Sequence, residues 1–369
     1  MPDFFININS LFVKRLGDWL ENMLNKYNFN EGIRVKEIDS CFLCKKRGTT
    51  LYKEMRDRIF EAPGLWAFFQ CPKCNLVWLS PRPISEDTER VYQRYNLNFS
   101  IFYNETSLRS KIRLSLIAAN FNSTDALKIP HSKWLRRFFK LIPLIKEVFG
   151  KRAIMYLSKS DGKRLLDVGC GGGSFLALMR DLGWEVMGVE PDEKAAEFAQ
   201  KQLGLKVLNQ TFEEANLPSN FFEAVTMRHV IEHVEEPIGF LEKGWQLLKP
   251  GGRLVIVTPN IKSLGSLIFK KNWLHLDPPR HFHLFSAETL ERCALLSGFK
   301  DLKVKIIPAA GEKTYLGSRD IQLRGKYKIN QPSSFGKEVK GLLFQFLEIF
   351  LSFFWPNLGE EIVLEATKN

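Results

Sequence analysis

Residues 164–191 read RLLDVGCGGGSFLALMRDLGWEVMGVEP, and this stretch decides the fold. The apolar run 165–168 ends in a cluster of glycines, as a buried parallel strand does when it enters a tight turn. Residues 175–182 carry apolar side chains at helical spacing, and a second apolar run, 186–189, ends at the acidic Glu190. Strand, glycine turn, helix, strand and acid together predict half of an α/β nucleotide-binding unit.

The glycine turn indicates which nucleotide fits. Its four characteristic positions are Asp167, Gly169, Gly171 and Gly173. The dinucleotide fingerprint would need glycine or alanine where Ser174 stands. The pattern D-x-G-x-G-x-G instead resembles motif I of class I methyltransferases that use S-adenosylmethionine (SAM). The resemblance implies that this turn admits the methionine end of SAM. It also implies that the Glu190 carboxylate accepts hydrogen bonds from both ribose hydroxyls.

The α/β alternation continues after residue 190. We expect helices over 192–203 and 241–248, and strands over 205–208, 224–227 and 253–258. The phrase LKPGGRLVI at 248–256 again resembles the methyltransferase superfamily, and the resemblance covers about 160–260. It places Phe212 beside the adenine, although a core position fits this ring equally well, and it adds Arg228 to the cofactor residues. A Rossmann-like, doubly wound α/β domain is therefore predicted over 161–308.

Length and composition favour a cytoplasmic protein of more than one domain. The chain has 369 residues, of which 45% are hydrophobic, enough for two or three domains with cores. Charged residues interrupt its first apolar residues, so no signal peptide is expected. The net charge of +12 is uneven, because 101–160 and 241–340 are basic and 161–240 is acidic. This distribution points to an anionic partner outside the cofactor cleft.

Two C-x-x-C pairs predict a structural zinc site. They are formed by Cys41, Cys44, Cys71 and Cys74. Two thiolate pairs on separate turns supply four tetrahedral ligands and leave no open position for catalysis. The continuation through residue 83 resembles the N-terminal zinc-binding module of bacterial sugar C-methyltransferases and of methyltransferases from glycan clusters. That family usually has glycine where Asn75 stands, and asparagine also tolerates positive φ. A zinc-ribbon-like module is expected over 36–98.

The remaining segments are predicted to be helical flanks. Residues 1–35 contain an amphipathic pattern over 11–27, and 99–160 form a basic linker or insertion. Within that linker, basic side chains alternate with aromatic ones over 131–159. This composition suits an anionic membrane surface, a nucleic acid, or a solvated face over a buried stripe. Residues 309–369 are predicted to contain an apolar helix over 341–355 and then a closing strand. The helix could be buried, at a dimer interface or in a membrane interface.

Two groups of histidines could take part in chemistry. His229, Glu232 and His233 resemble the E-x-x-E-H metal motif of ubiquinone and small-RNA methyltransferases, but a histidine replaces the first acid. A strand-to-helix cap is the alternative. The second group lies in PRHFHLFS at 279–286, which resembles a segment of the zinc-module methyltransferases. Imidazole titrates near neutrality, so His281 and His283 are the candidate contacts or bases for an acceptor hydroxyl.

The sequence as a whole predicts a methyltransferase that uses SAM and carries a structural zinc. Resemblance and the basic, membrane-prone flanks favour a saccharide acceptor, nucleotide-linked or lipid-linked, and a peripheral position at the inner face of the membrane. An RNA methyltransferase, a ubiquinone-type O-methyltransferase and a non-catalytic zinc-dependent adaptor are the alternatives. The intact glycine turn and Glu190 argue against the adaptor. The sequence determines neither the acceptor atom nor the oligomeric state.

Overall fold

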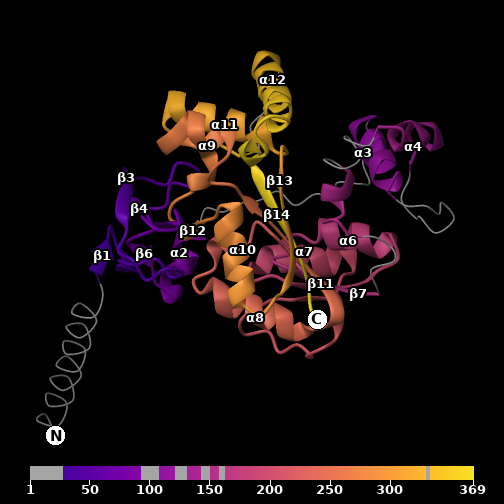
Figure 1. Ribbon diagram of the computed structural model, residues 1–369, viewed down its shortest axis with the longest axis horizontal. Helices are drawn as coiled ribbons and strands as arrows, with labels where there is room; N and C mark the ends of the chain where they lie inside the picture. Colours follow the sequence, from indigo (N-terminus) through magenta and orange to yellow (C-terminus); the bar gives the residue numbers. More distant parts are fainter. Residues whose placement is uncertain (1–27, 93–107, 121–130, 143–149, 158–162, 330–332) are drawn as a thin grey trace, which may run out of the picture.

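The computed structural model describes residues 28–92, 108–120, 131–142, 150–157, 163–329 and 333–369. They form a seven-stranded sheet flanked by helices, with a smaller group of strands packed beside it (Figure 1). The helix expected over 11–27 lies outside the described residues.

The large sheet has the strand order β13-β14-β11-β10-β7-β8-β9. β14 pairs antiparallel with both of its neighbours, and the other strands share one direction. The bounds are β7 Arg164–Val168, β8 Glu185–Val189, β9 Val207–Leu208, β10 Phe222–Arg228, β11 Leu248–Pro259, β13 Asp301–Ile307 and β14 Glu361–Thr367. The order reverses between β7 and β10, and α/β sheets of this kind bind ligands at the carboxyl ends of the strands beside such a reversal. The predicted doubly wound fold is confirmed.

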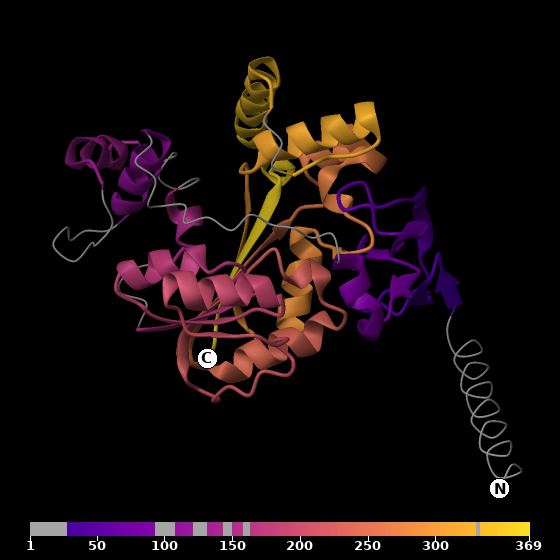
Figure 2. The same ribbon diagram turned by 180° about the vertical axis from the view of Figure 1, so that it is seen from behind.

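Alternate side chains of the strands pack into two separate cores. Leu165 belongs to the core that contains helices α6 and α7, and Leu166 belongs to the core that contains α8 and α10. The helices span α6 Ser174–Asp181, α7 Glu193–Leu203, α8 Pro237–Leu247 and α10 Ala287–Leu296. Seen from behind, α6 and α7 lie over the sheet (Figure 2). Ser286 caps the N-terminus of α10 in a capping box that includes Thr289.

The N-terminal module consists of two small sheets and a short helix. One sheet has the order β1-β2-β6 and the other β12-β5-β4-β3. Their strands are β1 Asn28–Asn30, β2 Ile33–Lys36, β3 Thr49–Met55, β4 Trp66–Gln70, β5 Val77–Leu79, β6 Arg82–Pro83 and β12 His283–Leu284, and helix α2 spans Thr88–Tyr92. β12 comes from the PRHFHLFS segment, and its His283 pairs with Trp78 of β5. The module therefore shares a sheet with a segment about 200 residues later, across the boundaries expected from the sequence.

Further helices flank the sheet. They are α3 Leu108–Ala118, α4 Lys133–Lys140, α9 Leu264–Phe269, α11 Gly311–Arg324 and α12 Phe335–Ser352. α9, α11 and α12 gather at one end of the molecule, whereas α3 and α4 lie to the side of them (Figure 1). No helix in these described ranges is long and apolar enough to cross a bilayer.

Helix α12 buries its polar side chains and exposes its apolar ones, the reverse of a usual surface helix. Its polar Gln345 and Glu348 are buried, while Leu343 is 62% exposed, Phe346 66% and Phe350 58%. The buried polar side chains have partners: the Glu348 carboxyl accepts hydrogen bonds from the Glu360 N–H at 2.7 Å and from Gln345 Nε2 at 2.8 Å. The helix is therefore attached through its polar stripe, and the described structure leaves its apolar face on the outside.

Burial keeps Glu348 protonated in the folded protein. Burial, together with the neighbouring carboxyl of Glu360, raises the pKa of Glu348 to about 9 from an ordinary value of 4.5. Between these two values the folded chain holds a proton that the unfolded chain has lost. Stability contributed by the neutral carboxyl is thus present at low pH and is lost as pH rises through this window.

We expect Glu348→Gln to flatten the dependence of stability on pH. For the wild type, the free energy of unfolding should fall by up to about 1.4 kcal/mol per pH unit from this one group as pH rises from 5 to 9. Glutamine cannot ionise, so that slope should disappear. Urea unfolding followed by circular dichroism at several pH values measures it. Glu242→Gln on the exposed side of α8 is the matched control and should keep the wild-type slope. Equal slopes in the wild type and Glu348→Gln would contradict the prediction.

Candidate functional site

The glycine turn after β7 leaves an open space at its tip. All three alternating glycines have positive φ, with 66° at Gly169, 53° at Gly171 and 76° at Gly173. A Cβ at Gly169 would lie 2.6 Å from Val230, and one at Gly173 would lie 2.6 Å from Leu205. A Cβ at Gly171 would meet no atom within 4 Å. Packing therefore requires the outer two glycines, whereas Gly171 borders a space that a ligand can enter.

Glu190 lies at the end of β8 and faces this turn. Its carboxylate accepts hydrogen bonds from the Gly171 N–H at 2.7 Å and from the Asp192 N–H at 3.0 Å, one on each oxygen. Each oxygen keeps a further lone pair for a ligand hydroxyl. Burial raises the pKa of Glu190. The turn and the acid are thus held together before any cofactor arrives, and the donor set fits the SAM ribose that the sequence predicts.

Asp167 supports the turn from beneath. Its side chain is buried and accepts a hydrogen bond from Thr226 Oγ1–H at 2.6 Å, which joins β7 to β10. Burial raises the pKa of Asp167 to about 7.

The other two predicted cofactor residues, Phe212 and Arg228, make contacts within the protein. Phe212 is 3% exposed and packs on Phe240 with ring centroids 4.8 Å apart, as its alternative position in the core predicts. Arg228 donates from its guanidinium to the Arg152 carbonyl and to Met155 Sδ. It thereby links the end of β10 to the preceding helical flank.

A charged network joins His229, which follows β10, to Glu361, the first residue of β14, across the end of the intervening β11. His229 has φ of 53° and donates through both ring nitrogens, to Glu232 at 3.2 Å and to Glu361 at 3.1 Å. Burial opposes ionisation, but the two carboxylates outweigh it and raise the pKa of His229 to about 9. Arg152 forms a bidentate ion pair with Glu361, at 2.5 and 2.6 Å. His229 is therefore a cation in a network of charges.

Glu232 and His233 lie on the 3-10 turn η4, Ile231–His233, and approach His281. One ligand atom from each of these three residues lies within 4.8 Å of the others. The rings of His233 and His281 meet edge to face, with centroids 4.6 Å apart. The third member of the cluster is thus His281 and not His229, because the left-handed backbone at His229 turns its ring toward β14. His281 is a predicted site residue that the structure places at the carboxyl edge of the sheet.

His283, the other histidine predicted in this segment, is buried on β12. Its side chain is 2% exposed, its Nδ1 bonds the Val234 carbonyl at 3.1 Å, and its Nε2 lies 3.1 Å from the Arg82 guanidinium. Burial and the charge of Arg82 hold its pKa well below the ordinary value. Both ring nitrogens are in use within the protein, so His283 has none to offer an acceptor. Its place on β12 explains this, because the strand buries the ring against the module.

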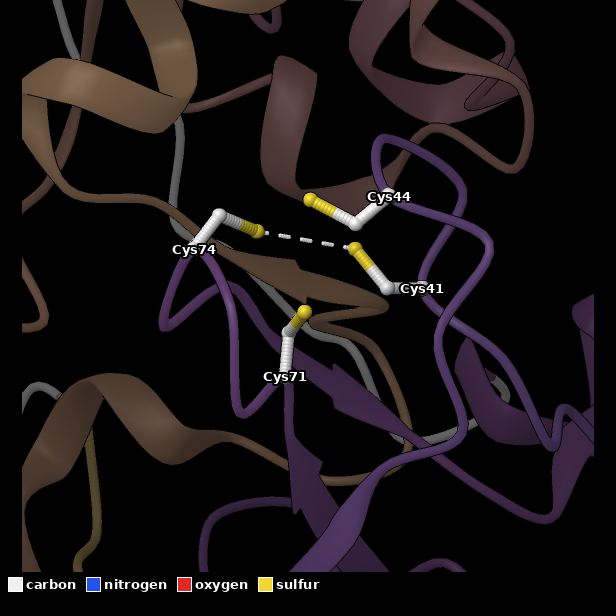
Figure 3. Close-up of side chains that lie close together, drawn as sticks. All are labelled: Cys41, Cys44, Cys71 and Cys74. Atoms are coloured by element: carbon white, nitrogen blue, oxygen red, sulfur yellow. Dashed lines mark hydrogen bonds between the residues drawn. The ribbon is translucent and has the colours of Figure 1, made fainter.

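The four cysteines converge as the two C-x-x-C pairs predict. Their sulfur atoms lie within 4.8 Å of one another and come from two turns of the module (Figure 3). The sulfurs of Cys41 and Cys74 lie 3.6 Å apart (Figure 3). Asn75 has φ of 62°, the conformation that the family usually provides with glycine. Four thiols in this arrangement fit the ligand set of a tetrahedral ion.

Sequence reasoning missed three residues that hold the site in place. Arg280 is buried and makes a bidentate ion pair with Asp57 of the module, at 2.7 and 2.8 Å. Glu361 begins the last strand and binds both Arg152 and His229. The closing strand itself was predicted, so an acid at its first residue was a signal that could have been used. Nothing local marks Asp57 as the partner of an arginine 223 residues later.

Residues 136–304 match a family model described as "Methyltransferase domain". This part of the chain, a little under half of it, is therefore similar to a methyltransferase domain. Two curated relatives are ubiquinone biosynthesis O-methyltransferases. The one from Schizosaccharomyces pombe is mitochondrial and is 34% identical over 135 residues, which is 34% of this chain and 47% of that protein. The one from Cereibacter sphaeroides is 35% identical over 133 residues, 34% of this chain and 54% of that protein. This chain thus spans about half the length of these relatives.

A solved SAM-dependent methyltransferase from Archaeoglobus fulgidus is also similar. It has 23% identity and a TM-score of 0.39, and the match covers 64% of this chain and 95% of that one.

The different surroundings of Gly171 and Gly173 allow a matched test of the glycine turn. Gly171→Ala should cost only the left-handed backbone penalty, about 1–2 kcal/mol of stability. Gly173→Ala should add about 1–3 kcal/mol for overpacking against Leu205 and Ala199. Urea unfolding of both variants measures the difference. A Gly171→Ala protein that is as unstable as Gly173→Ala would contradict the open space at the tip of the turn.

Proposed function

We propose that the protein is a SAM-dependent methyltransferase. The observation that carries this proposal is the pairing of Gly171 with Glu190: an open glycine tip stands beside a buried carboxylate whose free lone pairs suit two hydroxyls. Bound there, SAM would supply an activated methyl group on its sulfonium. The turn and Glu190 would hold the cofactor, so most of the catalysis would come from positioning and from exclusion of water.

The acceptor is proposed to bind at the carboxyl edge, next to His281 and His233. In the described chain, these rings belong to the cluster at that edge whose ligand atoms converge. Burial lowers the pKa of His233 to about 4, so its ring is neutral at physiological pH. A neutral imidazole can accept a hydrogen bond from an acceptor hydroxyl. His229, a cation enclosed by Glu232 and Glu361, would position the carboxylate and would not take a proton.

We propose a saccharide, carried on a lipid, as the acceptor. Two segments carry the sequence resemblance to sugar and glycan-cluster methyltransferases, and they lie together: β12 of PRHFHLFS pairs with β5 of the cysteine module. They form one wall beside the His281 edge. A ubiquinone-type O-methyltransferase is the second candidate, and the names of the curated relatives favour it. Those matches cover about a third of this chain. The other two thirds could therefore recognise either a saccharide or a ubiquinone-type acceptor.

The apolar face of α12 supports a substrate at a membrane. Apolar side chains are exposed along this helix and just after it: Leu342, Leu343, Phe346, Leu347, Phe350, Phe353, Phe354 and Trp355. Leu267 and Ile268 of α9 are also exposed, and both helices pack on α11. Lys270, Lys271 and Lys340 supply positive charge at this end. Aromatic and aliphatic side chains with nearby lysines are the composition of an interfacial helix on an anionic bilayer.

We further propose that Cys41, Cys44, Cys71 and Cys74 bind a structural zinc. Tetrathiolate zinc sites are closed and contribute folding energy. The ion would fix the two turns next to β5, and through β5 the segment that contains His281. The zinc would therefore hold the acceptor-binding segment in place and would take no part in transfer of the methyl group.

The SAM proposal is tested by calorimetry and by methyl transfer. We expect micromolar affinity for SAM, about −8 kcal/mol. Glu190→Ala should weaken it by about 1.5–3 kcal/mol, because two hydrogen bonds to a charged group are lost. Gly171→Ala should also weaken it, because the new methyl group enters the ligand space. Glu193→Ala, an exposed acid on α7, is the control and should bind normally. Absence of SAM binding to the folded wild type would refute the proposed function.

Labelled SAM then identifies the acceptor. Lipid-linked saccharides, polyprenylated phenols and RNA are offered in parallel to the same preparation. Transfer to the saccharide is the expected result, transfer to the phenol would establish the second candidate, and transfer to RNA would overturn both.

Membrane binding is tested on α12. Phe346→Asp combined with Phe350→Asp should abolish co-sedimentation with liposomes that contain anionic lipid, because both rings lie on the exposed face. The same change at Leu295 and Leu296, which are 50% and 52% exposed on α10, is the matched control and should leave binding intact. Circular dichroism checks the fold of each variant. Equal sedimentation of the two double variants would exclude α12 as the contact.

A further inference from the structure

The two cysteine turns pack against helix α10 of the α/β domain. Cys41 and Cys71 belong to the core that contains α8 and α10. The same core includes Leu290 and Cys293, which come from α10 itself. In both ribbon views α10 lies on the side of the domain that faces the module (Figures 1 and 2). The thiol cluster therefore lies at a contact between two parts of the chain and not at an outer corner of the module.

Three of the four sulfur atoms receive hydrogen bonds from their own turns. The donors are backbone N–H groups a short way further along the chain: Leu43 and Cys44 for Cys41, Lys73 and Cys74 for Cys71, and Leu76 for Cys74. Hydrogen bonds of this kind favour the thiolate, which is the form of cysteine that binds a metal. Both turns are thus folded around their sulfur atoms.

The fourth sulfur, that of Cys44, receives a donor from outside the module. Arg292 of α10 donates through Nη1 to Cys44 Sγ at 3.1 Å and through Nη2 to the Leu43 carbonyl at 3.0 Å. Its planar guanidinium thus binds two adjacent groups of the first cysteine turn at once. A lysine ammonium has no such fixed fork.

The charge of Arg292 suits a cluster that holds a metal ion. Four thiolates around one divalent cation leave two negative charges in excess. A guanidinium at hydrogen-bond distance from one sulfur offsets part of this excess, and a hydrogen bond to an ionised sulfur is stronger than one to a neutral thiol. The contact is therefore worth more when Cys44 is a metal-bound thiolate, and by reciprocity it strengthens metal binding.

We propose that Arg292 is an outer partner of the zinc ion and links the metal centre to α10. The inference rests on the proposed zinc site and extends that site beyond the module. Helix α10 begins at its cap Ser286, shortly after β12 and the segment that contains His281. Loss of the metal would therefore loosen the helix next to the acceptor-binding segment as well as the two cysteine turns.

Competition with a chromogenic zinc chelator tests the role of Arg292 in the full chain. Arg292→Met removes the charge and both donors but keeps an unbranched apolar side chain, and it should weaken zinc binding about 10- to 100-fold. Arg292→Lys keeps the charge without the fork, so its affinity should fall between those of Arg292→Met and the wild type. Lys73→Met is the matched control. It removes the same charge from an exposed side chain in the second cysteine turn, keeps the backbone N–H, and should bind zinc as the wild type does.

Hydrogen exchange in α10 distinguishes a metal partner from an arginine that only supports the fold. In the wild type, removal of zinc should speed amide exchange over 287–296 as well as in the cysteine turns. In Arg292→Met, α10 should already exchange faster with zinc bound, and removal of the metal should change it little. An arginine that only supported the fold would slow exchange equally with and without zinc. Circular dichroism confirms that each variant folds.

Wild-type zinc affinity in Arg292→Met, or an equal loss of affinity in Lys73→Met, would overturn the role of Arg292. Exchange in α10 that does not respond to zinc in the wild type would also overturn it, as would a wild-type protein that takes up no zinc. SAM calorimetry on the same samples keeps the proposals apart. The expected zinc effects without SAM binding would leave the link to α10 and refute the methyltransferase function. SAM binding without the zinc effects would overturn the link alone.

Discussion

A buried ion pair between Arg280 and Asp57 connects the cysteine module to the α/β domain. The arginine is 1% exposed, and its guanidinium also contacts Asp277 and the ring of Phe60. A buried charge without partners would cost several kcal/mol, so the module and the segment before β12 must be in place together. The carbonyl of the same arginine orients His233. The geometry of the acceptor edge thus depends on an interaction between parts of the chain that are more than 200 residues apart.

The sequence predicted those parts of the fold that local patterns determine. Strands β7, β8, β10 and β11 are short apolar runs between turn residues, and α7 and α10 begin at recognisable caps, Asp192 and Ser286. The glycine turn and the cysteine pairs were also readable, because their residue types and spacing are set by backbone conformation and by the geometry of ligation. Each of these features needs information from a few neighbouring residues only.

The parts that were missed depend on topology or on a balance of burial and charge. Position 229 adopts a left-handed backbone, which turns its ring to Glu361 and leaves its place in the cluster to His281; neither event has a local signature. The spacing of PRHFHLFS put His281 and His283 on one side of an extended segment, but pairing with β5 buried one ring and left the other at the edge. The sequence left the apolar helix over 341–355 as buried, at a dimer interface or in a membrane interface. In the structure its polar Gln345 and Glu348 are buried, and burial raises the pKa of Glu348.

The shared sheet of β3, β4, β5 and β12 has a consequence for how this protein could be taken apart. A fragment that ended at residue 92 would lose the strand that covers β5, and it would present unpaired backbone groups along a strand edge, which invites association with other chains. The cysteine module is therefore not a transplantable unit in the linear sequence. An engineer who wished to exchange acceptor preference between two such proteins would have to move 28–92 and 277–286 as one block.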